Sequence, residues 1–153
     1  MVDVSAYAHV MIQPGRASFT VTSTETDPER ISELLGLIPT RIERRGADRQ
    51  SDRARTHNMW SIDGNWLSNS EADQTGTGAS TELITRTRAA AGKIQTLPTD
   101  CKVRIWWSAD SDSTQGEFVI SPELCKGIAE LGVDVFATVY FDADTDADAG
   151  ADD

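Results

Sequence analysis

Six arginines fall within a short stretch in the first half of the chain and form its only dense basic cluster. They are Arg41, Arg44, Arg45, Arg49, Arg53 and Arg55, and three acidic residues stand among them. A guanidinium group is planar and offers several N–H donors, so it binds carboxylates and phosphates through paired hydrogen bonds. Residues 41–60 are therefore a candidate site for an anionic partner.

His57 and Trp60 add an ionisable group and an aromatic ring to the same segment. An enzyme with its site near His57 is one hypothesis, because histidine can transfer protons near neutral pH. The opposing interpretation is that the arginines solvate a loop or pair with the acids of this chain. The other histidine, His9, lies in a predicted strand without a second ligand-type residue at a supporting spacing, so we expect it to be structural.

Motifs of the common enzyme and cofactor classes are absent from the sequence. There is no GxSxG, HExxH, paired CxxC or dinucleotide-binding glycine pattern. Cys101 and Cys125 are too few for a zinc site, and we expect both to be buried, reduced thiols. The alternating aspartates from Asp142 onward lack the glycine and glutamate that a calcium loop requires. The sequence therefore predicts no metal, no cofactor and no catalytic residue.

The net charge of the chain is strongly negative but unevenly distributed. It is -11 over 153 residues, and residues 142–153, DADTDADAGADD, carry six aspartates and no basic residue. Removing these six charges leaves -5 for residues 1–141. A net-negative chain is repelled by nucleic acid at long range, so nucleic acid is an unfavoured partner unless the arginines override that repulsion. We expect residues 142–153 to form an acidic, disordered tail.

No segment of the sequence is suited to a membrane span or to export. The N-terminal residues contain an early acid and no basic group ahead of the apolar residues, unlike a secretory signal. No apolar run approaches the roughly 18 residues of a membrane span. We therefore expect a cytoplasmic protein, and 39% hydrophobic and 25% charged residues are ordinary for a soluble one.

The N-terminal part predicts strands followed by a well-marked helix. Residues 4–12 and 17–23 are rich in β-branched and aromatic residues on either side of a turn, which predicts two antiparallel strands or one bent strand. Asp27 is suited to cap a helix that ends at Gly36. The buried face of this helix is expected to consist of Ile31, Leu34, Leu35 and Ile38. The arginine-rich residues that follow are mostly polar, so we expect an exposed loop that leads into a strand at Met59.

The middle of the chain predicts a long helix and then a β-hairpin. Apolar residues recur at steps of three and four over residues 81–97, as on one face of a helix. Residues 101–108 predict a strand, and residues 117–120 the strand that returns from it. Adjacent residues of a strand point to opposite faces, so one of Trp106 and Trp107 is expected in the core. The other is expected beneath another element or exposed on a binding surface.

The C-terminal part predicts a capped helix and a last strand. Ser121 is suited to cap a helix that ends at Gly132. Residues 133–141 alternate apolar side chains in the manner of a strand. Phe136 and Tyr140 on the second face of this strand imply that this face is covered as well.

In chain order, these elements are β(β)-α-β-α-β-β-α-β, which is typical of an α+β protein with helices packed on a mainly antiparallel sheet. From residue 57 onward, the order β-α-β-β-α-β is that of a ferredoxin-like unit, preceded by an extra hairpin and helix. We therefore expect a single α+β domain over residues 1–141, followed by the acidic tail.

Three segments resemble the bacterial family called domain of unknown function 4279. They are FTVTSTETDPERISELLGLIPTRIERRG, the Met59–Trp60 pair and SPELCKGIAELGVDVFATVYFD. The resemblance spans roughly residues 18–141, and the chain departs from it by the extra N-terminal strand, the arginine excess after Gly46 and the acidic tail. It implies a small soluble bacterial or phage protein and supplies no catalytic residue.

The sequence favours a non-catalytic binding or interaction protein that engages an acidic protein or a phosphate-bearing ligand. The candidate binding residues are Arg41, Arg44, Arg45, Arg49, Arg53, Arg55, His57 and Trp60. An immunity-type protein, expressed beside a toxin, is a more specific form of this hypothesis. The alternatives are a nucleic-acid or phosphate-ligand binding protein and an enzyme with its site near His57.

Overall fold

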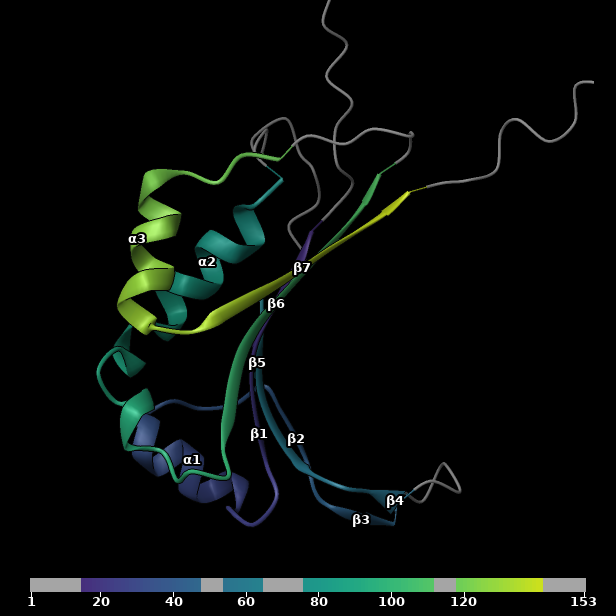
Figure 1. Ribbon diagram of the computed structural model, residues 1–153, viewed down its shortest axis with the longest axis vertical. Coiled ribbons are helices and arrows are strands. Elements are labelled where there is room, and N and C mark those ends of the chain that lie inside the picture. Colours follow the sequence, from purple (N-terminus) through teal and green to yellow (C-terminus); the bar gives the residue numbers. More distant parts are fainter. Residues whose placement is uncertain (1–14, 48–53, 65–75, 112–117, 142–153) are drawn as a thin grey trace, which may run out of the picture.

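The computed structural model describes residues 15–47, 54–64, 76–111 and 118–141. These residues form a five-stranded sheet with three α-helices on one face (Figure 1). The fold is α+β, as predicted. The other face of the sheet is not covered by any helix or strand of the described residues, and we call it the open face (Figure 1).

The first strand of the sheet lies at its centre. The strands are β1 (Arg16–Ser23), β2 (Arg41–Glu43), β5 (Asn58–Asp63), β6 (Lys102–Ser111) and β7 (Asp134–Phe141), in the order β2-β5-β1-β6-β7. The pairs β1–β5, β1–β6 and β2–β5 are antiparallel, whereas β6–β7 is parallel. A mainly antiparallel sheet is therefore confirmed. The predicted strand over residues 4–12 lies outside the described residues.

The ferredoxin-like order is not confirmed, because the predicted hairpin from 101 to 120 is wrong. The described part of its second strand, Phe118 to Ile120, has no strand structure. The hydroxyl of Thr77, just before α2 (Gly78–Thr87), donates to the carbonyl of Val119 at 2.6 Å. This hydrogen bond holds the segment in the helix layer, so the strand beside β6 is β7 instead.

The core lies between the helices and the sheet. Alternate residues of the central strands point to the helix side, so that Ala17 and Phe19 of β1 lie opposite Trp107 and Ile105 of β6. The helices contribute Ile31, Leu35, Leu83, Ile84, Leu124 and Leu131, which are all buried. Burial of these side chains is the main force that holds the helix layer to the sheet.

The first helix, α1 (Pro28–Leu35), ends as predicted at Gly36. Gly36 has φ of 68° and donates its N–H to the carbonyl of Ser32, which closes the helix with a left-handed residue. Two details of the prediction are wrong. The side chain of Asp27 makes no capping hydrogen bond. Ile38 is 88% exposed, because it lies beyond the end of the helix and not on its buried face.

The second helix, α2, is much shorter than the predicted helix over 81–97. After Thr87 the chain forms 3₁₀ turns over Arg88–Ala90 and Ile94–Thr96. Gly92 between them has φ of 78°, a left-handed conformation that interrupts a helix. The apolar spacing therefore continues through a segment whose backbone is not α-helical.

The third helix, α3 (Pro122–Leu131), follows the prediction closely. The Ser121 hydroxyl accepts the backbone N–H of Leu124 at 3.1 Å, and Gly132 ends the helix with φ of 68°. The expectation of two buried thiols is wrong for Cys125, which is exposed on α3, whereas Cys101 is partly buried and both are free. Burial raises the pKa of the Cys101 thiol.

Candidate functional site

The arginine-rich segment is not the simple exposed loop that its composition predicts. Arg41–Glu43 forms β2 at the edge of the sheet, and β3 (Gly46–Ala47) pairs with β4 (Ala54–Arg55) as a small two-stranded sheet. The prediction failed because backbone pairing with β5 satisfies the polar groups of β2 whatever its side chains are. Arg49 and Arg53 lie outside the described residues.

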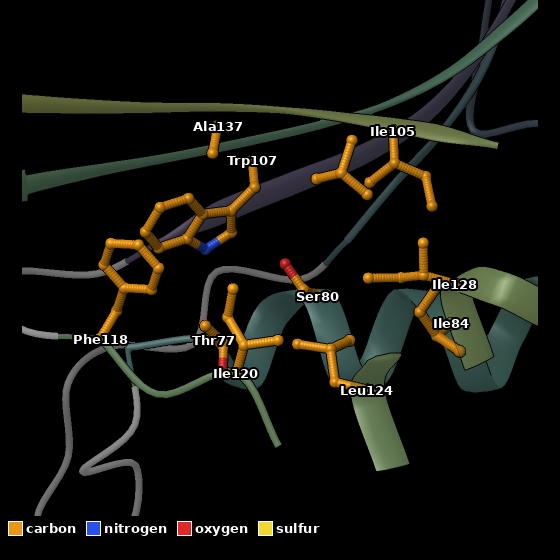
Figure 2. Close-up of a pocket in the computed structure, with 11 residues that line it drawn as sticks. Thr77, Ser80, Ile84, Ile105, Trp107, Phe118, Ile120, Leu124, Ile128 and Ala137 are labelled. Carbon is orange, nitrogen blue, oxygen red and sulfur yellow. The ribbon is translucent and has the colours of Figure 1, made fainter. Parts of the chain in front are cut away.

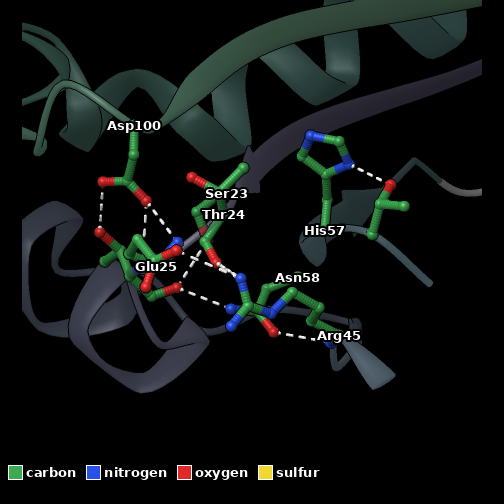
Figure 3. Close-up of polar contacts among 9 residues, drawn as sticks. Ser23, Thr24, Glu25, Arg45, His57, Asn58 and Asp100 are labelled. Atoms are coloured by element: carbon green, nitrogen blue, oxygen red, sulfur yellow. Dashed lines mark hydrogen bonds and ion pairs between the residues drawn. The ribbon is translucent and has the colours of Figure 1, made fainter. Parts of the chain in front are cut away.

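Arg44 and Arg45 lie between β2 and β3, and each pairs with a glutamate near α1. Arg44 contacts Glu29 in the first turn of α1, and this side-chain hydrogen bond lowers the pKa of Glu29. Arg45 lies 3.2 Å from Glu25 and donates to the carbonyl of Thr24 at 2.8 Å (Figure 3). The two arginine side chains remain 57% and 51% exposed, so these surface pairs leave them accessible to a partner.

Arg41 and Arg55 share Glu43 at the edge of the sheet. Arg55 contacts Glu43 directly. The guanidinium group of Arg41 is 3.8 Å from Glu43 and 3.7 Å from Asp63, which is longer than a hydrogen bond at either carboxylate. Arg41 is therefore loosely held in an electrostatic pair that a closer carboxylate or phosphate can replace.

The structure separates His57 from Trp60, which were predicted to share a site. His57 is exposed, with Nδ1 2.7 Å from the Thr56 hydroxyl (Figure 3). Trp60 is fully buried, and its indole N–H donates to the Ser32 hydroxyl at 2.8 Å. The prediction that Trp60 belongs to a binding surface is wrong, because its place in β5 directs the ring to the helix-covered face, against Phe19.

A carboxylate that no sequence pattern singled out anchors the turn before α1. Asp100 accepts the backbone N–H groups of Glu25 at 2.8 Å and Thr26 at 2.9 Å, and the Thr26 hydroxyl at 2.7 Å (Figure 3). These hydrogen bonds, led by that from Glu25, lower the pKa of Asp100 to about 2. Asn58 donates to the Thr26 carbonyl and accepts the N–H of Arg45, so the same network positions Arg45.

An aromatic and basic cluster lies on the open face. The rings of Trp106 on β6 and Phe136 on β7 have centroids 4.9 Å apart, and the Arg104 guanidinium lies 4.7 Å from the Phe136 centroid and 5.9 Å from that of Trp106. Trp106 is 42% exposed, Phe136 38% and Tyr140 60%. The expectation that this face of the last strand is covered is therefore wrong. Trp107 is the core residue of the tryptophan pair.

A polar groove runs beside this cluster on the same side of the sheet. It has a volume of about 400 Å³, and its walls include Arg16 and Ser18 of β1, Arg41 of β2, Asp63 of β5 and Trp106 of β6. The groove thus joins one arginine of the predicted site to the aromatic cluster. Sequence reasoning missed it because its walls come from strands far apart in the chain.

Charges of both signs alternate across the open face. Strand alternation places four basic residues there, Arg16, Arg41, Lys102 and Arg104. It also places four acidic residues there, Glu43, Asp63, Asp110 and Asp134. These charges sum to zero, so the strands of the open face do not present a purely basic surface.

The described residues contain no group of three or more histidine, cysteine or acidic side chains arranged to hold a metal ion. None of the helices in the described ranges is long and apolar enough to cross a membrane.

A protein-family model matches residues 13–142, which include every described strand and helix. The chain belongs to the family described as domain of unknown function (DUF4279). The resemblance predicted from the sequence is confirmed. No curated protein and no solved structure matches the chain. The open face and the arginine-rich segment both lie within the DUF4279 domain.

Proposed function

We propose that this DUF4279 protein is a non-catalytic interaction module that binds an acidic region of another protein through its open face. The observation that carries the proposal is the exposed cluster of Arg104, Trp106 and Phe136 beside the groove that contains Arg41. Tryptophan, tyrosine and arginine supply most of the binding energy at protein interfaces, in which they are surrounded by polar residues.

Arginines at the edge of the sheet support an acidic partner. Arg44 and Arg45 are about half exposed, and each is held by an exposed glutamate. Replacement of the glutamate in such a weak surface pair by a carboxylate of the partner costs little free energy, because the arginine still has a charged hydrogen-bond acceptor. The arginine segment predicted from the sequence thus becomes the flank of the proposed interface, and Trp106 becomes its centre.

Nucleic acid is the less favoured partner for this surface. Duplex and single-stranded nucleic acids are bound mainly through phosphate contacts, which require a net positive face. The open face carries four basic and four acidic side chains, and the whole chain has a net charge of -11. Mixed charges instead favour a protein partner with a complementary pattern of charges.

An immunity-type role in the cytoplasm is the specific form of the proposal that we favour. In that role, the open face covers an acidic region of a toxin encoded beside this chain. The enzyme alternative near His57 has less support, because the described contact of the imidazole is with the neighbouring Thr56 hydroxyl and not with a second ionisable group.

The proposal is tested by co-purification with the products of adjacent genes. We expect Trp106→Ala to weaken the complex by more than about tenfold, as for an aromatic residue at the centre of an interface. Arg41→Glu should weaken it as well, because the reversed charge repels an acidic partner. Phe118→Ala is the matched control, since Phe118 is similarly exposed, at 41%, but packs on the helix side against Trp107.

Three results would reject the proposal or its specific form. Full binding by Trp106→Ala and Arg41→Glu, with an unchanged melting temperature, would exclude the open face. Binding of a single-stranded oligonucleotide at low salt by the unaltered chain, with no protein partner found, would favour the nucleic-acid alternative. The immunity role would be excluded if this chain binds the toxic product of an adjacent gene but its co-expression does not relieve the toxicity.

A further inference from the structure

A second, apolar cavity lies on the opposite side of the sheet from the open face. It is lined by residues of α2, α3, β6, β7 and the segment before α3, is partly open to solvent, and has a volume of about 100 Å³ (Figure 2). Its walls include Ile84 of α2, Leu124 of α3 and Val135 of β7, together with Ile120. The cavity shares no lining residue with the polar groove of the open face.

One wall of this cavity carries a polar group without a partner. Trp107 is 4% exposed, and its indole N–H has no hydrogen-bond partner among the described residues. Figure 2 shows the nitrogen on the edge of the ring that faces Thr77 and Ser80 across the cavity. The Thr77 hydroxyl is already committed to the carbonyl of Val119 at 2.6 Å.

A buried donor without a partner is unfavourable, since the group has lost its hydrogen bonds to water. Such groups are rare in folded proteins, and each one calls for a specific explanation. Here the unpaired N–H belongs to a ring that lines a cavity with mostly apolar walls, to which Thr77 and Ser80 add two hydroxyls. Small-molecule sites likewise combine an apolar lining with a few orienting polar groups.

We propose that this cavity binds a small, largely apolar molecule that carries one hydrogen-bond acceptor, such as a ketone, ester or ether oxygen. The acceptor binds the Trp107 indole N–H, and the hydrocarbon part contacts Ile84, Leu124 and Val135. An indole nitrogen donates but does not accept, so the group that binds it must be an acceptor. An engineered apolar cavity of about 150 Å³ holds benzene, so about 100 Å³ suits a molecule of roughly five non-hydrogen atoms.

Butan-2-one is a suitable probe, and 2-methylbut-1-ene is its matched analogue with a CH₂ group in place of the carbonyl oxygen. The chain contains four tryptophans, so ¹⁵N-labelled protein gives four indole N–H signals that can be followed by NMR. We expect butan-2-one to shift the Trp107 signal in a saturable manner, with Kd on the order of 1 mM for so small a ligand. The alkene cannot accept the hydrogen bond, so its binding should not depend on the indole N–H.

Adjacent tryptophans provide the matched variants. Trp107→Phe removes the donor and should weaken binding of butan-2-one by at least about fivefold, because the buried carbonyl then has no partner, while binding of the alkene should change less. Trp106→Phe changes the neighbouring residue on the open face and should leave binding of butan-2-one unchanged. Ala137→Ile adds three carbon atoms to the cavity wall and should abolish binding of both probes.

The NMR titration of the unaltered protein decides the question even if a variant does not fold. An unshifted Trp107 signal up to about 100 mM butan-2-one, well above the expected Kd, would overturn the proposal and leave a bound water as the partner of the indole. An equal effect of Trp107→Phe on the ketone and the alkene would also overturn it. These outcomes are independent of whether the open face binds a protein.

Discussion

At the scale of single residues, Asp100 shows how one carboxylate can determine the shape of a functional edge. Its side chain binds two backbone N–H groups and one hydroxyl in the turn between β1 and α1. That turn supplies the carbonyl of Thr24 to Arg45 and the carbonyl of Thr26 to Asn58. A change at Asp100 should therefore affect both stability and the placement of Arg45.

We expect Asp100→Asn to lower the free energy of unfolding by about 1 kcal/mol at pH 7, an estimate reduced for solvent screening of a partly exposed group. The folded-state pKa is about 2 and the ordinary value is 3.8. Because the folded pKa is the lower one, the contribution is fully present above about pH 4 and is lost as the pH falls toward 2.

Urea unfolding at pH 7, 4, 3 and 2 measures this dependence. The two proteins should converge in stability at the lowest pH. Asp110→Asn, at an exposed position of the open face, serves as the control and should change stability by less than about 0.5 kcal/mol. A constant difference between Asp100→Asn and the unaltered chain from pH 7 to pH 2 would contradict the assignment.

Residue-level predictions succeeded when the interaction is local in sequence. Ser121 and Gly132 at the ends of α3 interact with residues three or four positions away, so the sequence alone identifies them. Asp100 could not be selected in this way, because its partners lie 74 and 75 positions earlier. Trp106 and Trp107 are predictable only in part. Strand alternation predicts that one of the two rings is buried, but it does not predict that Trp106 is exposed.

At the scale of elements, α2 and α3 approach each other closely at Gly127. This glycine is buried in α3, and a Cβ atom placed on it would lie 2.3 Å from Cγ2 of Ile84 on α2. The absence of a side chain therefore lets the two helices pack together above the apolar cavity, which Ile84 also lines.

Gly127→Ala should destabilise the protein by about 1–3 kcal/mol through overpacking, although alanine in a helix is otherwise favoured over glycine by about 1 kcal/mol. Removal of the opposing methyl group in the double variant Gly127→Ala with Ile84→Ala should recover part of the loss, beyond the sum of the two single effects. Chemical denaturation of the four proteins gives this coupling. Additive effects would show that the contact with Ile84 does not limit the packing.

Element types were predicted better than element lengths and pairings. Residues 81–97 have a helical apolar period, but the left-handed conformation of Gly92 depends on the tertiary structure and interrupts the helix. Phe118 to Ile120 has the composition of a strand but is bound in the helix layer through Thr77. Composition cannot distinguish these cases, because an apolar segment is buried equally well by a helix layer or a sheet.

At the scale of the whole molecule, the sheet separates two proposed sites with different chemistry. The open face is polar, aromatic and bears both charge signs, whereas the helix side holds a mostly apolar cavity whose wall includes the unpaired indole N–H of Trp107. The family and fold class were predictable, because they follow from patterns along the chain. The strand order was not, because it depends on which edges the later strands occupy.

Long-range charge gives a prediction for the complete chain. Removal of residues 142–153 changes the net charge from -11 to -5, so binding of an acidic peptide such as poly-glutamate should strengthen at low salt. The difference should shrink as salt is raised, since screening shortens the range of these charges. A chain with its six C-terminal aspartates changed to asparagine should behave like the truncated one. Equal affinities of the full and truncated chains would contradict the prediction.

The central position of β1 has a consequence for synthesis on the ribosome. β1 is the first described strand to be made, yet its neighbours β5 and β6 begin only at Asn58 and Lys102. At about 5–20 residues per second, the second neighbour emerges on the order of five to fifteen seconds after β1 is complete. During that interval, an apolar strand with unpaired backbone groups is open to other nascent chains, so the rate of translation between Ser23 and Lys102 should influence how much of the product folds.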